Sequence, residues 1–149
     1  MTNHDQHFEK EDAVAISLKF ANQAVGSFLL SDRTPSPWTW EMALGESEKF
    51  PKTGMNAIRF LGTEGALEFP NLVLWRHAEG NGNWHHEIRP EVIDAPFIDA
   101  YVAQCAHLRA VTRGLETPII DALNGSRSLD ATLAAARAAT SGTRIKLSM

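Results

Sequence analysis

The chain has 149 residues, of which 44% are hydrophobic and 21% charged, and its formal net charge is −4. This length favours one domain, residues 1–149, and the acidic balance argues against a nucleic-acid partner. No apolar run approaches the ~18 residues of a membrane span, and the polar residues 1–8 are expected to form a loose lead-in, not a signal peptide. A single cysteine excludes an internal disulfide and fits a reducing cytoplasm.

The first half of the chain has the pattern of antiparallel strands. Between residues 13 and 20 large apolar and smaller or polar side chains alternate, which is typical of a strand with one apolar face. "ANQA" predicts a tight turn, followed by a return strand over 25–30. Further strands are expected at "AIRFLG" and "ALEF", which flank the hairpin link Gly62-Thr63-Glu64-Gly65, and at "LVLWRH" (72–77) and "WHHEI" (84–88).

After Pro96 the pattern changes to that of helices. Apolar residues at three- and four-residue steps predict a helix of about five turns that ends near Gly114. A second helix is expected between the cap residue Asp121 and Gly142, followed by a final strand, "TRIKL". This order favours an α+β fold: a large, mostly antiparallel sheet with two main helices packed on one face and the other face open. The first helix carries its apolar stripe on Ile98, Tyr101, Val102, Cys105, Leu108 and Thr112.

Histidines and the cysteine offer little chemistry. His85 and His86 are adjacent, so they point to opposite faces of a strand, and no carboxylate or cysteine joins them and His77 in a zinc pattern; no metal site is predicted. His107 is expected to be a half-buried histidine that hydrogen-bonds a loop. Cys105 is expected in the core, because it lies on the apolar stripe.

The loop "SDRTPSPWTWE", residues 31–41, is the candidate binding element. Prolines end the preceding strand, and Trp38 and Trp40 stand among Ser31, Asp32 and Glu41. Indole rings pack on the apolar face of a sugar while hydroxyl and carboxylate groups satisfy its hydroxyls. The alternative is a loop that two tryptophans hold against the sheet. The residues alone leave both open.

The chain carries no Gly-x-Gly-x-x-Gly after a strand and no Gly-Lys-Ser/Thr phosphate loop. It therefore has no nucleotide-binding unit of its own. No serine-histidine-acid order and no paired-carboxylate spacing is evident either, so no catalytic residue is predicted.

Four segments, in order, resemble the C-terminal domain of the Gfo/Idh/MocA family, the glucose–fructose oxidoreductase and inositol dehydrogenase group. They are "EDAVAISLKFANQAVGSFLLSD", "SPWTWE", "IRFLGTEGALEFPNLVLW" and "HLRAVTRGLETPIIDALNGSRSLDATLAAARAATSGTRIKL". The resemblance as a whole extends over about residues 8 to 147. The resemblance implies a sheet whose open face forms the subunit interface, and a neighbouring Rossmann domain that binds NAD or NADP. Its implied substrates are sugars, polyols and related hydroxy compounds, with Ser31, Asp32, Trp38 and Trp40 lining the substrate side.

The chain also departs from the family. The Rossmann domain, the Glu-Lys-Pro segment and the Asp-x-x-x-His helix have no counterpart in these residues, and His4 and His7 do not take the catalytic role. Gln23 stands where the family prefers glycine; a type I′ turn would force it to a positive φ, so a different turn is expected.

Two functions follow as alternatives. In the first, the chain is the substrate-side and dimerisation domain of an NAD(P)-dependent oxidoreductase, cytoplasmic, unable to transfer hydride alone, and joined to itself through the open sheet face or to a Rossmann-containing chain. In the second, it is a free-standing, non-enzymatic sugar-binding or assembly module that dimerises through its sheet.

Overall fold

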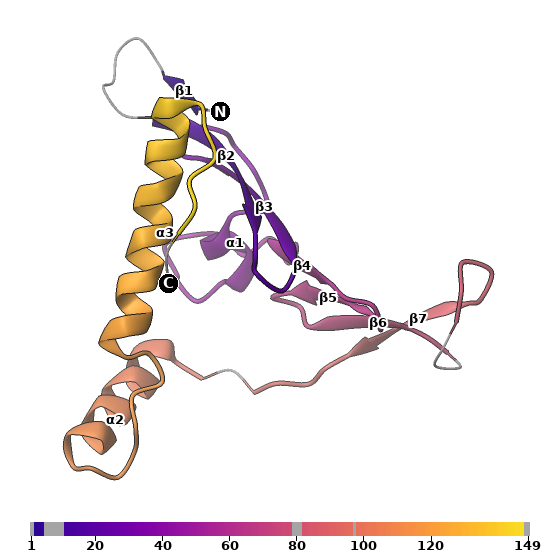
Figure 1. Ribbon diagram of the computed structural model, residues 1–149. Helices are drawn as coiled ribbons and strands as arrows, with labels where there is room; N and C mark the ends of the chain where they lie inside the picture. Colours follow the sequence, from indigo (N-terminus) through magenta and orange to yellow (C-terminus); the bar gives the residue numbers. More distant parts are fainter. Residues whose placement is uncertain (1, 5–10, 79–81, 97, 148–149) are drawn as a thin grey trace. The chain divides into compact units, whose positions relative to one another are not determined.

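A computed structural model describes residues 2–4, 11–78, 82–96 and 98–147 (Figure 1). The chain folds as two compact units. Unit 1 combines Met1–Thr34 with His107–Met149, and unit 2 is Pro35–Ala106. Seven strands and three helices are described; helix α2, Ala100–Thr112, runs through the point in the sequence where unit 2 ends and unit 1 resumes.

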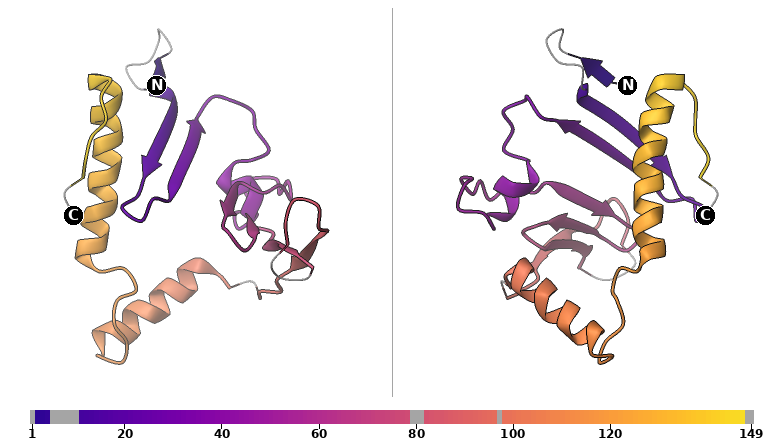
Figure 2. Two further views of the ribbon diagram at one scale, coloured as in Figure 1. Left: turned by 45° about the vertical axis from the view of Figure 1, so that its right-hand side comes forward. Right: turned by 90° about the vertical axis from the view of Figure 1, so that its left-hand side faces the viewer.

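Unit 1 contains an antiparallel sheet in the order β1-β2-β3, formed by Thr2–His4, Glu11–Lys19 and Val25–Ser31. The alternation expected over residues 13–20 is present: Val14, Ile16 and Leu18 are half-buried, whereas Ala15 and Ser17 are exposed. The half-buried residues Val14, Ile16 and Leu18 thus share one face of the sheet. Helix α3, Ala122–Ser141, lies alongside this sheet in each view (Figures 1 and 2).

Helix α3 begins and ends as predicted. The Asp121 side chain accepts a hydrogen bond from the Asn124 N–H at 2.7 Å, which satisfies one of the free N–H groups of the first turn. Gly142 closes the other end with φ 65°, where a residue without a Cβ is favoured. The least exposed side of α3 is built of alanines, among which Ala134 is only 7% exposed. Small side chains allow a helix to approach a sheet closely.

The turn between β2 and β3 differs from a type I′ turn. Gln23 N–H donates to the Phe20 carbonyl at 3.0 Å and Phe20 N–H to the Ala24 carbonyl at 2.9 Å, so three residues form the loop. Gln23 takes a φ of 72°. This is the arrangement of a tight turn followed by one left-handed residue, a position that favours glycine.

We expect Gln23→Gly to raise the free energy of unfolding by up to about 1 kcal/mol, because the left-handed conformation costs a residue with a Cβ about 1–2 kcal/mol, and the added chain entropy of glycine offsets part of the gain. Urea titration followed by circular dichroism measures the difference. Ala21→Gly in the same loop is the control and should lower stability, because Ala21 is not among the residues with positive φ. An equal decrease in the free energy of unfolding for both variants would contradict the proposal that the backbone at Gln23 is strained.

Unit 2 contains the second antiparallel sheet, in the order β4-β5-β6-β7. As predicted, Gly62 and Gly65 close the hairpin between β4 and β5, with the Gly62 N–H bonded to the Gly65 carbonyl at 2.9 Å. Pro90 lies in β7, which pairs with β6 alone and can therefore accept a residue that lacks an N–H. The strands are β4 (Ile58–Leu61), β5 (Ala66–Phe69), β6 (Val73–His77) and β7 (Ile88–Val92).

Three local predictions were wrong. Residues 84–86 form a turn, and the strand begins only at Ile88. The His86 N–H donates to the Asn83 carbonyl, and the Asn83 N–H donates to the His86 Nδ1, so neither N–H bonds a neighbouring strand. "TRIKL", residues 143–147, is not a strand, because none of the described strands pairs with it. The lead-in is ordered at Thr2–His4, which form β1; Met1 and residues 5–8 lie outside the described residues.

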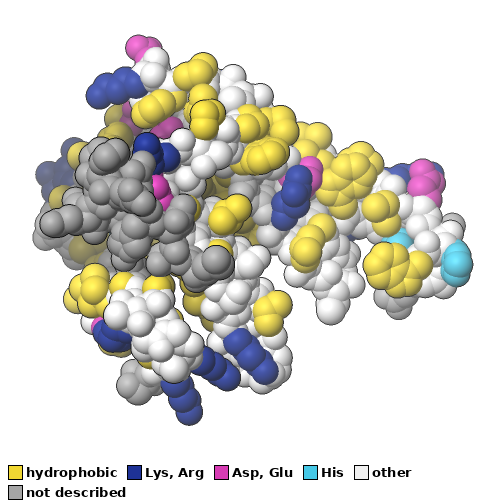
Figure 3. Space-filling model, turned by 90° about the horizontal axis from the view of Figure 1, so that it is seen from above, with side chains coloured by type: hydrophobic (Ala, Val, Ile, Leu, Met, Phe, Trp, Pro, Cys, Tyr) yellow, Lys and Arg dark blue, Asp and Glu magenta, His cyan; other side chains and the backbone are white. Residues whose placement is uncertain are grey.

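The α+β class with antiparallel sheets is confirmed, but little of the chain is buried. Among the described residues only Ala43 and Ala134 are buried hydrophobic residues, and apolar side chains appear at the surface in Figure 3. Cys105 is exposed as well, so the expectation that it lies in the core is wrong. Exposed apolar side chains in clusters are typical of surfaces that contact other molecules.

Candidate functional site

The four residues predicted to line a substrate belong to different units. Ser31 and Asp32 end the β3 segment in unit 1, whereas Trp38 and Trp40 lie in unit 2. All four are exposed to solvent. Each pair therefore has its own local surroundings.

Ser31 and Asp32 lie in a hydrogen-bonded turn. The Ser31 and Thr34 hydroxyls are 2.8 Å apart, and the Arg33 N–H donates to the Ser31 hydroxyl at 3.4 Å. The Asp32 N–H donates to the Asp12 carbonyl at 3.1 Å, which extends the pairing of β3 with β2 by one residue. The backbone of both residues is thereby held in place while their side chains face solvent.

Trp38 and Trp40 flank the start of a short helix that the sequence analysis missed. Helix α1 comprises Trp40–Leu44, and its cap Thr39 accepts a hydrogen bond from the Met42 N–H at 3.4 Å. The signal was available: a threonine before an acidic residue in the first turn, and Gly45 at the C-terminal end with φ 68°. The two tryptophans are thus placed by a helix start and not by an irregular loop.

The two indoles have different surroundings. Trp40 stacks on Phe69 of β5, with ring centroids 5.4 Å apart and an interplanar angle of 28°. Within the described residues Trp38 has no such aromatic partner, and 59% of it is exposed, against 49% of Trp40. Trp40 therefore fastens α1 to the sheet of unit 2, whereas Trp38 presents most of its ring to solvent.

Hydrogen bonds hold the segment that carries Trp38. The Thr53 hydroxyl donates to the Pro37 carbonyl at 2.8 Å, and the Trp38 N–H donates to the Ser36 hydroxyl at 3.2 Å. Residue 53 is in turn fixed to α1, because its N–H donates to the Met42 carbonyl at 2.9 Å. An exposed aromatic ring on a fixed backbone can bind the apolar face of a ligand with little loss of entropy.

A polar network lies beside Phe69, the residue of β5 on which Trp40 stacks. The Glu68 carboxylate accepts from the Asn56 amide and from Arg59, both at 3.2 Å. The Asn71 side chain donates to the Gly54 carbonyl at 2.7 Å, and its N–H donates to Asn56 at 3.1 Å. These bonds join the segment before β4 to the end of β5, next to Phe69. Their role is to position the strand end against which Trp40 stacks.

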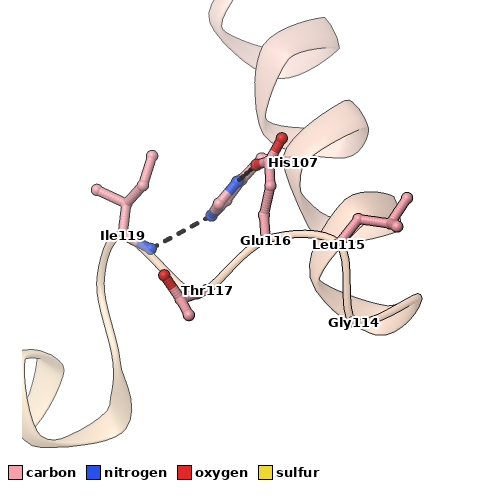
Figure 4. A pocket seen from close by; sticks show the side chains of 6 residues that line it. All are labelled: His107, Gly114, Leu115, Glu116, Thr117 and Ile119. Atoms are coloured by element: carbon pink, nitrogen blue, oxygen red, sulfur yellow. Dashed lines mark hydrogen bonds and ion pairs between the residues drawn. The ribbon is translucent and has the colours of Figure 1, made fainter.

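His107 is engaged at both ring nitrogens (Figure 4). Its Nδ1 lies 2.6 Å from a Glu116 carboxylate oxygen, and its Nε2 accepts the Ile119 N–H at 3.3 Å. The acceptor role of Nε2 places the proton on Nδ1 in the neutral ring. The prediction of a half-buried histidine bonded to a loop is confirmed. The shallow hollow around it, about 470 Å³, is lined by His107, Gly114, Leu115, Glu116, Thr117 and Ile119.

A larger hollow of about 800 Å³ lies at the far end of the second sheet. His77 and His86 approach there with ring centroids 6.5 Å apart, edge to face. Salt bridges link Arg76 to Glu91 and Arg89 to Glu87. Hydrogen bonding and charge from Arg89 lower the pKa of Glu87 and, reciprocally, raise that of Arg89. This exposed pair is stabilising near neutral pH and loses its effect as the pH falls through the lowered pKa of Glu87.

The described residues contain no dinucleotide-binding unit of the Rossmann type. In that unit a nicotinamide dinucleotide binds where a parallel strand leads through a glycine-rich turn into a crossover helix. All described strand pairs are antiparallel, and no helix connects two parallel strands. The same residues contain no group of three or more metal-ligating side chains, and none of their helices is long and apolar enough to cross a membrane.

No protein-family model, no curated protein and no solved structure matches this chain.

Proposed function

We propose that the chain is the substrate-side and subunit-association domain of an NAD(P)-dependent oxidoreductase that acts on sugars, polyols or related hydroxy compounds in the cytoplasm. The observation that carries the proposal is Trp38: an exposed indole on a backbone that hydrogen bonds hold in place. The order of four segments that resemble the Gfo/Idh/MocA family, and the antiparallel α+β architecture, support it further.

The proposal divides the work between this domain and a separate nucleotide-binding domain or chain. NAD or NADP would bind to that partner, because the described residues here contain no parallel strand pair with a crossover helix. This chain's residues bind and orient the substrate. In unit 2, Trp38 offers an apolar ring for the C–H face of a sugar. In unit 1, Ser31 and Asp32 offer a hydroxyl and a carboxylate, the groups that bind ligand hydroxyls. Trp40 holds α1 in place and is the fourth of the residues proposed to line the substrate.

The open face of the β1-β2-β3 sheet is proposed as the surface for association with a second copy. Residues of β3 on this face include Leu29, which is 82% exposed, and Val25, which is 78% exposed. Their cross-strand partners are Ala15 and Lys19, and Lys19 is the one charge among these four residues. An apolar face with so little charge is typical of surfaces buried between subunits.

The test of substrate binding uses calorimetric titration with a panel of sugars and cyclic polyols. We expect weak binding of at least one of them by the wild type, and a loss of about tenfold or more for Trp38→Ala, the scale of 1.4 kcal/mol. Trp84→Ala is the matched control, because Trp84 lies in unit 2 and is fully exposed in a turn outside the proposed site. Equal weakening by both variants, or binding that Trp38→Ala leaves unchanged, would exclude Trp38 as a substrate contact.

The same sample separates the two classes of function. Titration with NADH and NADPH, followed by tryptophan fluorescence, should show no binding by this chain alone. Tight nucleotide binding would overturn the proposed division of work. A ligand bound by the chain alone, with no gain in affinity or turnover on addition of a nucleotide-binding partner, would favour the free-standing sugar-binding module.

A further inference from the structure

The first turn of α3 contains an asparagine followed by a glycine, Asn124-Gly125. Asparagine is one of the thermolabile residues, because the backbone nitrogen of the next residue can attack its side-chain amide. Glycine offers the least hindrance to this attack, since it has no side chain. Both residues are exposed to water. Apart from the chain neighbours of Gly125 and the backbone of its own helix, no atom of the described residues lies within 4 Å of where a Cβ would stand.

Asp121 binds both of the groups that would react. Its side-chain Oδ1 accepts from the Asn124 backbone N–H at 2.7 Å and from the Asn124 side-chain Nδ2 at 3.0 Å. Its backbone carbonyl accepts the Gly125 N–H, also at 3.0 Å. The nitrogen that would leave and the nitrogen that would attack are therefore both held by one residue, the cap of the helix.

The helical backbone also keeps the two groups out of line. A residue in an α-helix has a ψ of about −42°, and its side chain points back toward the start of the helix. Gly125 is the next residue in the opposite direction, so its nitrogen reaches the Asn124 side-chain carbon only after rotation about the Asn124 ψ. That rotation breaks the bond between the Gly125 N–H and the Asp121 carbonyl. The reaction thus requires the first turn of α3 to open.

We infer that Asn124 is a site of spontaneous deamidation whose rate is set by the opening of the first turn of α3, with Asp121 as the residue that holds this turn closed. In the open turn the Gly125 nitrogen gives up its proton and bonds the Asn124 Cγ, and the Cγ–Nδ2 bond breaks. The Nδ2 takes up a proton and leaves as ammonia. One water then opens the succinimide ring and yields aspartate or isoaspartate. The inference goes beyond the proposed function and does not depend on it.

The two products act differently on α3. Aspartate at position 124 leaves the backbone intact and adds a negative charge to the first turn, where the helix dipole favours it, although Asp121 three residues earlier repels it. Isoaspartate carries the main chain through the former side chain and lengthens it by one atom. The bond from the Gly125 N–H to the Asp121 carbonyl then loses its register, and the helix loses its first turn. Isoaspartate is therefore the product that changes the structure.

The experiment follows the full chain during incubation at mildly alkaline pH, in native buffer and in concentrated urea. Peptide mass spectrometry measures the conversion of Asn124, and chromatography separates aspartate from isoaspartate. We expect the native chain to react more slowly than the unfolded chain, by a factor of the same order as the protection of the Gly125 amide in hydrogen exchange. Asp121→Ala should raise the native rate about fivefold, the factor that loss of a cap adds to opening.

Three variants serve as controls. Asp121→Asn keeps a side-chain oxygen that caps as well as aspartate, so its native rate should stay near that of the wild type. Asp130→Ala removes an exposed aspartate of α3 outside the first turn and should change nothing. Gly125→Ala should slow the reaction in urea, since its Cβ hinders the attacking nitrogen.

The comparison in urea separates the closed turn from any direct chemical effect of Asp121. There the wild type and Asp121→Ala should react equally fast, because no turn is left to open. Native and unfolded chains that deamidate at the same rate would overturn the inference. So would a native rate that Asp121→Ala does not raise, or an Asn124 that stays unmodified in urea.

Discussion

Ala134→Glu is expected to unfold α3 from its sheet and to lower the free energy of unfolding by about 3 kcal/mol or more, because it would place an unpaired carboxylate in the most closely packed part of unit 1. Ala134 is 7% exposed and is the buried residue of α3. Charged groups keep their charge in such a place only with a partner, and both the carboxylate and its larger volume oppose the close helix–sheet contact. The measurement is hydrogen exchange of the α3 amides together with urea unfolding.

Ala136→Glu is the control for that experiment. It makes the same change in the same helix, two residues on, at an exposed position. Its expected effect on the free energy of unfolding is within about 0.5 kcal/mol, as for other surface changes. Fast exchange in both variants would mean that helix propensity and not packing limits α3; slow exchange in both would mean that the sheet does not cover Ala134.

Trp40→Ala is expected to cost about 2 kcal/mol of stability in unit 2, and Trp38→Ala less than about 1 kcal/mol, although both remove an indole within three residues. Trp40 is half-buried and stacks on Phe69 at 5.4 Å, whereas Trp38 is mostly exposed. Loss of a partly buried aromatic side chain removes its apolar contacts and leaves a gap at the sheet. Urea unfolding followed by near-ultraviolet circular dichroism measures both variants.

A double-mutant cycle isolates the stacking itself. Phe69→Ala, Trp40→Ala and the double variant should give a coupling of about 0.5–1.5 kcal/mol, the range for aromatic pairs. A coupling near zero would show that each ring packs independently. Equal costs for Trp38→Ala and Trp40→Ala would show that both indoles hold the loop, and Trp38 would then lose its role as the free, ligand-facing ring.

Local patterns in the sequence predicted the local structure well. The alternation of Val14, Ile16 and Leu18 predicted β2 and its apolar face, and Asp121 and Gly142 marked the two ends of α3, because strand alternation and helix caps depend on residues close together in the chain. Helix α1, which the sequence analysis did not predict, also has local signals, but these are ambiguous. Helix α1 is short, and its threonine cap stands among prolines and tryptophans that are equally typical of a loop.

For the candidate site, the sequence determined which side chains stand near one another along the chain, and so it identified Ser31, Asp32, Trp38 and Trp40 together. Only the tertiary structure assigned the first two to one unit and the tryptophans to the other, and it alone distinguished Trp40, stacked on Phe69, from the open Trp38. Contacts between strands far apart in sequence decide such differences, and no spacing rule within the loop contains them.

Helix α2 shows the same division most clearly. The sequence by itself determined that the helix has an apolar stripe centred on Cys105, because a repeat of 3.6 residues places those positions on one side. Only the tertiary structure decided that the loop after α2 bonds His107 and that Cys105, at the centre of the stripe, is exposed. Periodicity records which side chains share a face, whereas burial depends on which other segment comes to lie on that face.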